Sequence, residues 1–135
     1  MKLLDANILL RLFLDDDKTQ VDAVEKFFHR AFQEKQELFV SDLTVAEIVW
    51  VMEKTGSLPP KVIAPILRSA LDDSRIHFEN RERLLAALAL YESRSVDFID
   101  AYQASLFQEK KLESVVSFDH DFSKLPVRWE NPKKS

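Results

Sequence analysis

The sequence predicts an α/β fold in which helices cover both faces of a central, mostly parallel sheet. Short apolar runs of strand length alternate along the whole chain with longer segments whose apolar residues recur at helical spacing. Such alternation favours parallel strands joined by crossover helices, and therefore a three-layer α/β/α arrangement. The length of 135 residues suits a single domain, residues 1–135, and no linker or internal repeat interrupts it.

The first half of the chain begins with a predicted strand at residues 2–4. Asn7 is expected to cap a largely apolar helix at residues 8–14. The next helix, at residues 19–35, carries apolar side chains at three-four spacing. The other elements expected here are a strand at 38–40, a helix at 44–54 ending at Gly56, a helix at 61–72 that Pro65 shortens or kinks, and a strand at 76–78.

The second half contains two predicted helices followed by two predicted strands. Asn80 is expected to cap a helix that ends near Tyr91, and a further helix begins near Asp97 and ends near Lys110. The strands are expected at 115–118 and 127–129, and the tail at 131–135 is expected to be frayed.

Composition excludes several classes of protein. The absence of cysteine removes disulfides, thiolate zinc sites and cysteine nucleophiles. The single glycine, Gly56, cannot supply a glycine-rich phosphate loop, which excludes P-loop and dinucleotide-binding enzymes. The longest apolar run, residues 8–14, contains Arg11 and is too short to span a bilayer. We therefore expect a cytoplasmic protein without a membrane partner. The net charge of −4 counts mildly against a nucleic-acid partner.

Five carboxylates are expected where a strand ends or a helix begins: Asp5, Glu47, Asp97, Asp100 and Asp119. In an open α/β sheet, ligands gather outside the carboxyl ends of the strands. Converging carboxylates repel one another and raise one another's pKa. A divalent cation relieves that repulsion, and an all-oxygen site suits magnesium or manganese. The pattern therefore indicates metal-dependent chemistry.

Each of these residues also has a purely structural interpretation. Thr44 and Glu47 have the spacing of a capping box, although the apolar flanks of Glu47 predict a partly enclosed place for it. Asp97 could be only a helix cap, and Asp100 could serve the helix dipole. Asp119 could simply form an Asx turn after a strand. These alternatives stay open for each residue taken alone.

Taken together, four motifs resemble the PIN-domain nucleases, especially toxins of the VapC type. The motifs are Leu4-Asp5-Ala6-Asn7-Ile8, Thr44-Val45-Ala46-Glu47-Ile48, Asp97-Phe98-Ile99-Asp100-Ala101 and Ser117-Phe118-Asp119-His120-Asp121-Phe122. They occur in order and cover nearly the whole chain. Ala6 and Ser117 depart from the family's usual hydroxyl residue and threonine, and neither change removes a carboxylate.

The resemblance implies hydrolysis of RNA phosphodiester bonds with Mg²⁺ or Mn²⁺. It makes Asp5, Asp100 and Asp119 the central metal ligands and catalytic residues. Glu47 would bind the metal directly or through water, or orient the nucleophile, and Asp97 would be a peripheral ligand. The supporting residues implied are Asn7, Ser117 and Asp121, with Arg11 as a candidate for binding substrate.

The resemblance also implies partners: an RNA substrate, a second copy of the chain in a homodimer, and an antitoxin protein. Trp50, Val51 and the phenylalanine-rich segment at residues 27–32 are candidate contact surfaces. Two alternatives remain. One is a non-catalytic PIN-like module that binds RNA or protein. The other is a phosphatase or receiver domain built around Asp5. The phosphatase ranks lower because Asn7 stands where it has a second aspartate, and the receiver because Asp5 stands alone and Lys124 comes late.

Overall fold

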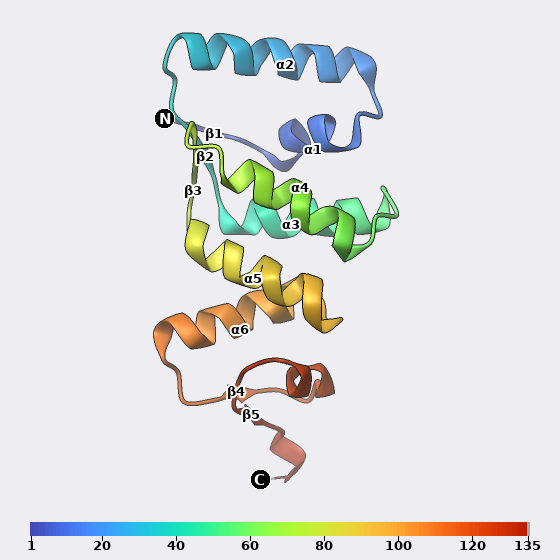
Figure 1. Ribbon diagram of the computed structural model, residues 1–135, viewed down its shortest axis with the longest axis vertical. Coiled ribbons are helices and arrows are strands. Elements are labelled where there is room, and N and C mark those ends of the chain that lie inside the picture. The colour runs from blue at the N-terminus through green and yellow to red at the C-terminus, as the bar shows by residue number, and fades with distance from the viewer. Residues whose placement is uncertain (135) are drawn as a thin grey trace. The chain divides into compact units, whose positions relative to one another are not determined.

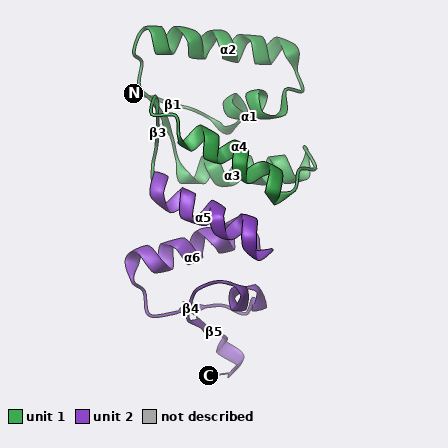
Figure 2. Ribbon diagram, viewed as in Figure 1, with its two compact units in different colours: residues 1–80 green, residues 81–135 purple. Residues whose placement is uncertain are grey.

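The computed structural model describes residues 1–134, and the chain divides into two compact units, residues 1–80 and 81–135 (Figure 2). The predicted α/β class is confirmed, since helices alternate with strands and all the strand pairs described are parallel. The strands form two sheets, one in each unit, where the sequence predicted one. No helix in the described part is long and apolar enough to cross a membrane.

The first unit is built on a three-stranded sheet with the order β1-β2-β3 (Figure 1). In the central strand, Leu38 pairs with Lys2 on one side and Ile76 on the other. Leu38 and Val40 point to the same face of the sheet and are fully buried, and Phe39 on the other face is partly exposed. The elements are β1 (Lys2–Leu3), α1 (Ala6–Leu14), α2 (Lys18–Gln33), β2 (Leu38–Val40), α3 (Asp42–Lys54), α4 (Pro60–Leu71) and β3 (Ile76–Phe78).

Helix α2 follows the predicted apolar spacing closely. Val21, Val24, Phe28 and Ala31 are buried along one face, and charged residues occupy the other. The Asp17 side chain accepts a 3.1 Å hydrogen bond from the main-chain N–H of Gln20, which caps the first turn. Asp17, the last residue of the acidic run at residues 15–17, is therefore the N-cap of this helix.

Two helix starts differ from the predictions by two residues. Asp5, not Asn7, is the N-cap of α1, and Asn7 lies inside the helix. Ser41, not Thr44, is the N-cap of α3, and its Oγ accepts a 3.2 Å hydrogen bond from the N–H of Thr44. Small polar residues cap helices interchangeably, so spacing alone chose the wrong one. The capping-box interpretation of Glu47 is consequently wrong, because Glu47 lies beyond the first turn of α3.

The end of α3 also differs from the prediction. The left-handed residue after this helix is Ser57, with φ of 52°, and Gly56 does not have a positive φ. Gly56 is needed for close approach, since an added Cβ would lie 2.8 Å from both Leu14 Cδ2 and the carbonyl oxygen of Met52. Helix α4 continues through Pro65, so the proline does not delay its start.

The second unit contains two packed helices and a small parallel sheet (Figure 1). The rings of Tyr91 and Phe98 meet edge to face with 5.7 Å between their centroids, at the end of one helix and the start of the next. The elements of the second unit are α5 (Arg81–Arg94), α6 (Phe98–Lys110), β4 (Val115–Val116), η1 (His120–Lys124), β5 (Trp129–Glu130) and η2 (Pro132–Lys134).

The predicted frayed tail is wrong for residues 132–134, which form the short 3-10 helix η2. The N–H of Lys133 donates to the Asn131 side chain at 3.0 Å, and the N–H of Lys134 donates to the Asn131 carbonyl at 2.9 Å. An asparagine can organise a short turn in this way. Ser135 lies outside the described residues.

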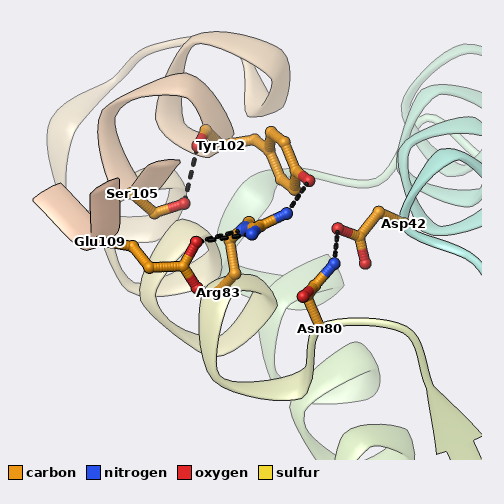
Figure 3. A network of polar contacts seen from close by, with 6 residues as sticks. All are labelled: Asp42, Asn80, Arg83, Tyr102, Ser105 and Glu109. Atoms are coloured by element: carbon orange, nitrogen blue, oxygen red, sulfur yellow. Dashed lines mark hydrogen bonds and ion pairs between the residues drawn. The ribbon is translucent and has the colours of Figure 1, made fainter. Parts of the chain in front are cut away.

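Polar contacts reinforce each unit internally (Figure 3). In the second unit, Arg83 donates to the Tyr102 hydroxyl at 3.0 Å and to the Glu109 carboxylate at 2.9 Å, and these bonds raise the arginine pKa. They join α5 to α6. In the first unit, the amide of Asn80 donates to the buried Asp42 carboxylate at 2.9 Å, joining the end of the β3 segment to the start of α3.

Candidate metal centre

Three carboxylates of the second unit come together: Asp100, Asp119 and Asp121. One oxygen of each lies within 4.8 Å of the others. Asp100 stands in the first turn of α6, Asp119 is the N-cap of η1, and Asp121 follows inside η1. Two segments separated in the sequence therefore bring their acidic side chains to one place.

The turn that carries two of these residues is fixed by hydrogen bonds. The Ser117 hydroxyl accepts a 2.9 Å bond from the N–H of Asp119, and Asp119 Oδ1 accepts a 2.9 Å bond from the N–H of Asp121. The indole N–H of Trp129 donates to the Ser117 carbonyl at 2.8 Å. The Asx-turn interpretation and the metal interpretation of Asp119 are thus compatible, because the turn itself presents the carboxylates.

The cluster changes the acidity of its half-buried member. The pKa of Asp100 is raised from 3.8 to about 6. Burial is the largest cause, followed by the negative charges of Asp119, Asp97 and Asp121 and a hydrogen bond with Asp119. Holding Asp100 ionised at neutral pH therefore costs free energy, and a bound cation would offset that cost.

The donor set fits a hard divalent cation. All three side chains offer carboxylate oxygens, which are the ligands that Mg²⁺ and Mn²⁺ prefer. His120, although next in sequence to Asp119, packs its ring against Trp129 at a centroid distance of 5.2 Å. The chemistry of the cluster thus favours an oxygen-bound ion over a nitrogen-bound one such as zinc.

Lys124 is a residue of this site that the sequence did not assign to it. Its Nζ lies 3.1 Å from Asp121 Oδ1, one 3-10 turn away. The spacing of an aspartate and a lysine three residues apart was the available signal, but such pairs are common on surfaces. A metal ion that bound Asp121 would therefore have to compete with Lys124 for this carboxylate.

Asp97 lies at the edge of the cluster and not within it. It is the N-cap residue of α6, yet its side chain makes no capping hydrogen bond. It is exposed, and its charge contributes to the raised pKa of Asp100. The peripheral-ligand role that the resemblance implied for Asp97 stays a prediction.

The remaining predicted ligands belong to the first unit. Asp5 is exposed, and as the N-cap residue of α1 it makes no side-chain cap bond; Asn7 is exposed in the first turn of that helix. Glu47 is also exposed, where a partly enclosed place was predicted. The prediction was wrong because the apolar neighbours on that face are themselves exposed, Leu43 by 80% and Trp50 by 59%.

Arg11, the candidate for binding substrate, is engaged elsewhere. Its guanidinium lies 3.2 Å from the Asp16 carboxylate, with the arginine side chain 22% exposed. Its Nε is buried without a hydrogen-bond partner among the described residues. The structure thus gives Arg11 a local role on α1, joining the helix to the acidic turn that follows.

The PIN domain family matches residues 2–127, which span both compact units. The chain therefore belongs to the PIN domain family. A VapC ribonuclease from Aquifex aeolicus (strain VF5) is 30% identical to it over 132 residues, which is 98% of this chain and 97% of that protein. Membership of this family excludes the phosphatase and receiver alternatives.

Proposed function

We propose that this protein is a metal-dependent endoribonuclease and the toxin of a toxin–antitoxin pair. The observation that carries the proposal is the convergence of Asp100, Asp119 and Asp121 in a member of the PIN domain family. The name of the Aquifex relative, a VapC ribonuclease, supports RNA as the substrate. The acidic set is costly to maintain without a cation, which disfavours a silent binding module.

Asp100 and Asp119 are the proposed central ligands, and Asp121 holds or orients the ion from the same turn. When bound, Mg²⁺ or Mn²⁺ would activate water and neutralise charge that develops on the phosphate oxygens. Burial raises the pKa of Asp100, and a bound cation would hold this carboxylate in its ionised form. Ser117 keeps the Asp119 carboxylate in position through the main chain.

Asp5 and Glu47 are proposed to complete the catalytic set, with Asp97 as a peripheral ligand and Asn7 as a supporting residue. This part rests on the motifs and on the family match. The carboxylate of an N-cap aspartate usually accepts a hydrogen bond from the main chain of its helix. Asp5 makes no such bond, which supports a role for it in the catalytic set. We also propose that residues 1–135 act as one domain in the cytoplasm.

The antitoxin is proposed to bind the first unit. Side chains of α1, α2 and α4 line an apolar pocket with a volume of about 690 Å³. Phe13, Phe28 and Phe32 contribute its aromatic surface. Arg75 is paired with Asp73 at the same pocket, which leaves the negative charge of Glu25 unbalanced there. A partner helix with bulky apolar residues and a basic side chain would complement this surface. Ser69→Trp, which fills the pocket, should prevent co-purification with the antitoxin while leaving RNA cleavage intact.

The homodimer is proposed to use the exposed face of α3. Leu43 and Trp50 lie on that face together with Glu47, and exposed apolar residues of this size commonly mark contact surfaces. Trp50→Glu should convert the dimer to a monomer in light scattering. An unchanged mass would remove Trp50 from the proposed interface.

The proposed activity is tested by incubating purified protein, free of antitoxin, with labelled RNA and Mg²⁺ or Mn²⁺. Cleavage should require the metal and should disappear with EDTA and in Asp5→Asn. Metal titration by calorimetry on the same samples separates two failures: a protein that binds no ion refutes the metal site, and one that binds an ion without cutting any RNA refutes the nuclease.

A further inference from the structure

The parallel pairing of β4 with β5 brings the C-terminal tail beside the acidic turn. Val116 pairs with Glu130, and the N–H of Ser117 donates to the Glu130 carbonyl at 3.0 Å. The chain then turns through η2, and Lys133 Nζ comes to lie 5.8 Å from the centroid of the Phe118 ring. A basic residue from the end of the chain thus meets an aromatic residue of the fourth motif.

Phe118 is unusual for its position. Its side chain is 62% exposed, although it directly precedes the Asp119 carboxylate. A phenylalanine that contributes to a core would be buried, as Phe122 is in the same motif. Packing therefore does not explain this large exposed ring, which belongs to the residue that precedes Asp119 in the sequence.

Hydrogen bonds hold the main chain on both sides of Phe118. On one side, the carbonyl of Ser117 accepts a hydrogen bond from the indole N–H of Trp129. On the other side, the main-chain N–H of Asp119 donates to the Ser117 hydroxyl. Both hydrogen bonds restrict the backbone that carries Phe118. An aromatic surface positioned in advance loses little entropy on binding, which favours recognition by stacking.

The chemistry of this pair matches a nucleotide of single-stranded RNA. Proteins bind unpaired bases by stacking them on aromatic side chains and bind the backbone with lysine or arginine. A cluster of three carboxylates repels phosphate, so a nearby cation is needed to hold the backbone there. Lys133 supplies that cation on the ring itself, and Lys134 and Arg128 are exposed in the adjoining segments.

We propose that Phe118 and Lys133 form a nucleotide-binding subsite for the RNA. A base next to the cleaved phosphodiester stacks on Phe118, and the Lys133 ammonium binds the adjoining phosphate. The inference rests on the proposed nuclease function, and it assigns a substrate-binding role to two residues outside the carboxylate set.

The test compares steady-state cleavage of a short single-stranded RNA by the wild type, Phe118→Ala and Phe118→Trp. Loss of one stacked base should raise KM about 5- to 100-fold in the alanine variant with little change in kcat. Tryptophan should restore KM, because it also stacks. Leu112→Ala is the matched control, since Leu112 is an exposed apolar residue of the same unit.

The lysine is tested by the salt dependence of RNA binding, measured by fluorescence anisotropy in EDTA so that no cleavage occurs. Lys133→Ala should weaken binding and lower the slope of log Kd against log salt by about 0.7, the contribution of one phosphate contact in a single strand. Lys110→Ala is the control, an exposed lysine at the end of α6.

These measurements separate the two proposals. If the wild type binds RNA but never cuts it, the nuclease proposal fails, and the anisotropy comparison still decides the subsite. If the wild type cuts RNA while Phe118→Ala and Lys133→Ala match their controls in KM and in binding, the subsite is refuted. Thermal unfolding verifies that each variant is folded, and Phe118→Trp tests the ring even if the alanine variant is unstable.

Discussion

The main-chain N–H of Asp121 donates a 2.9 Å hydrogen bond to Oδ1 of Asp119, so one acidic residue orders the backbone of the other. The bond engages Oδ1 of Asp119, and the same carboxylate also forms a hydrogen bond with Asp100. Together with Asp100 on α6, the turn presents carboxylate oxygens within 4.8 Å of one another. Asp119 therefore forms both the turn that orders this segment and part of the carboxylate cluster that could hold a metal ion.

Asp100→Asn should stabilise the metal-free protein near neutral pH. The folded-state pKa of Asp100, about 6, exceeds its ordinary value of 3.8, so the folded state binds the proton more tightly than the unfolded state. The stability this provides is fully present below pH 3.8 and is lost as the pH rises through about 6. In EDTA, the melting temperature of the wild type should fall as the pH rises through about 6, and that of Asp100→Asn should not show this fall. Identical pH profiles for the two proteins would contradict the raised pKa.

Mn²⁺ should raise the melting temperature, and the rise should be larger near neutral pH than at about pH 5, because ligand carboxylates must be ionised to bind metal. Asp119→Asn should abolish most of the shift. Asp22→Asn, a change at an exposed aspartate of α2, is the matched control and should keep it. Equal shifts in the two variants would show that the ion binds elsewhere. Differential scanning fluorimetry gives all of these values.

Lys124→Ala should increase the affinity for Mn²⁺. The lysine ammonium lies 3.1 Å from the Asp121 carboxylate and must give way when an ion binds there. Exposed ion pairs contribute about 0.2–1 kcal/mol, which corresponds to an affinity gain of about 1.5- to 5-fold. Calorimetric titration at low salt measures it. A weaker affinity in the variant would mean that Lys124 supports the site instead of competing for it.

Gly56→Ala should destabilise the protein although the backbone there is not left-handed. Its Cβ would meet Leu14 and the Met52 carbonyl at 2.8 Å, and crowding of this kind costs about 1–3 kcal/mol. Ser57→Gly should have the opposite sign, since Ser57 has φ of 52° and glycine removes that strain. Chemical denaturation of both variants provides the comparison. A stable Gly56→Ala protein would show that the contact can relax.

Periodicity predicted the elements well where one face of a helix is buried. The stripe Val21, Val24, Phe28 and Ala31 on α2 and the buried Leu38 and Val40 of β2 follow directly from apolar spacing. Helix ends were less predictable. Asp5 and Ser41, not Asn7 and Thr44, are the caps. The Ser41 hydroxyl accepts the N–H of Thr44, whereas the Asp5 side chain makes no capping bond, so a cap preference could not single out Asp5.

The sequence predicted part of the acidic cluster that the structure contains, and the roles of Asp5, Glu47 and Asp97 stay predictions. Asp100, Asp119 and Asp121 do come together, but Asp121 was expected only to support the others. Its ion pair with Lys124 depends on the 3-10 geometry of η1, which no apolar pattern signals. The exposed position of Glu47 was missed because apolar neighbours in a sequence do not by themselves enclose a residue.

The central claim is tested most directly by RNA cleavage with four proteins in one assay: the wild type, Asp5→Asn, Asp119→Asn and the control Asp22→Asn. With Mn²⁺, the wild type and Asp22→Asn should cut, and all cutting should stop in EDTA. Asp5→Asn and Asp119→Asn should each lose activity by at least about 100-fold, the scale expected when a group that stabilises the transition state is removed. Full activity in Asp119→Asn, or cutting that persists in EDTA, would contradict a nuclease built on these carboxylates.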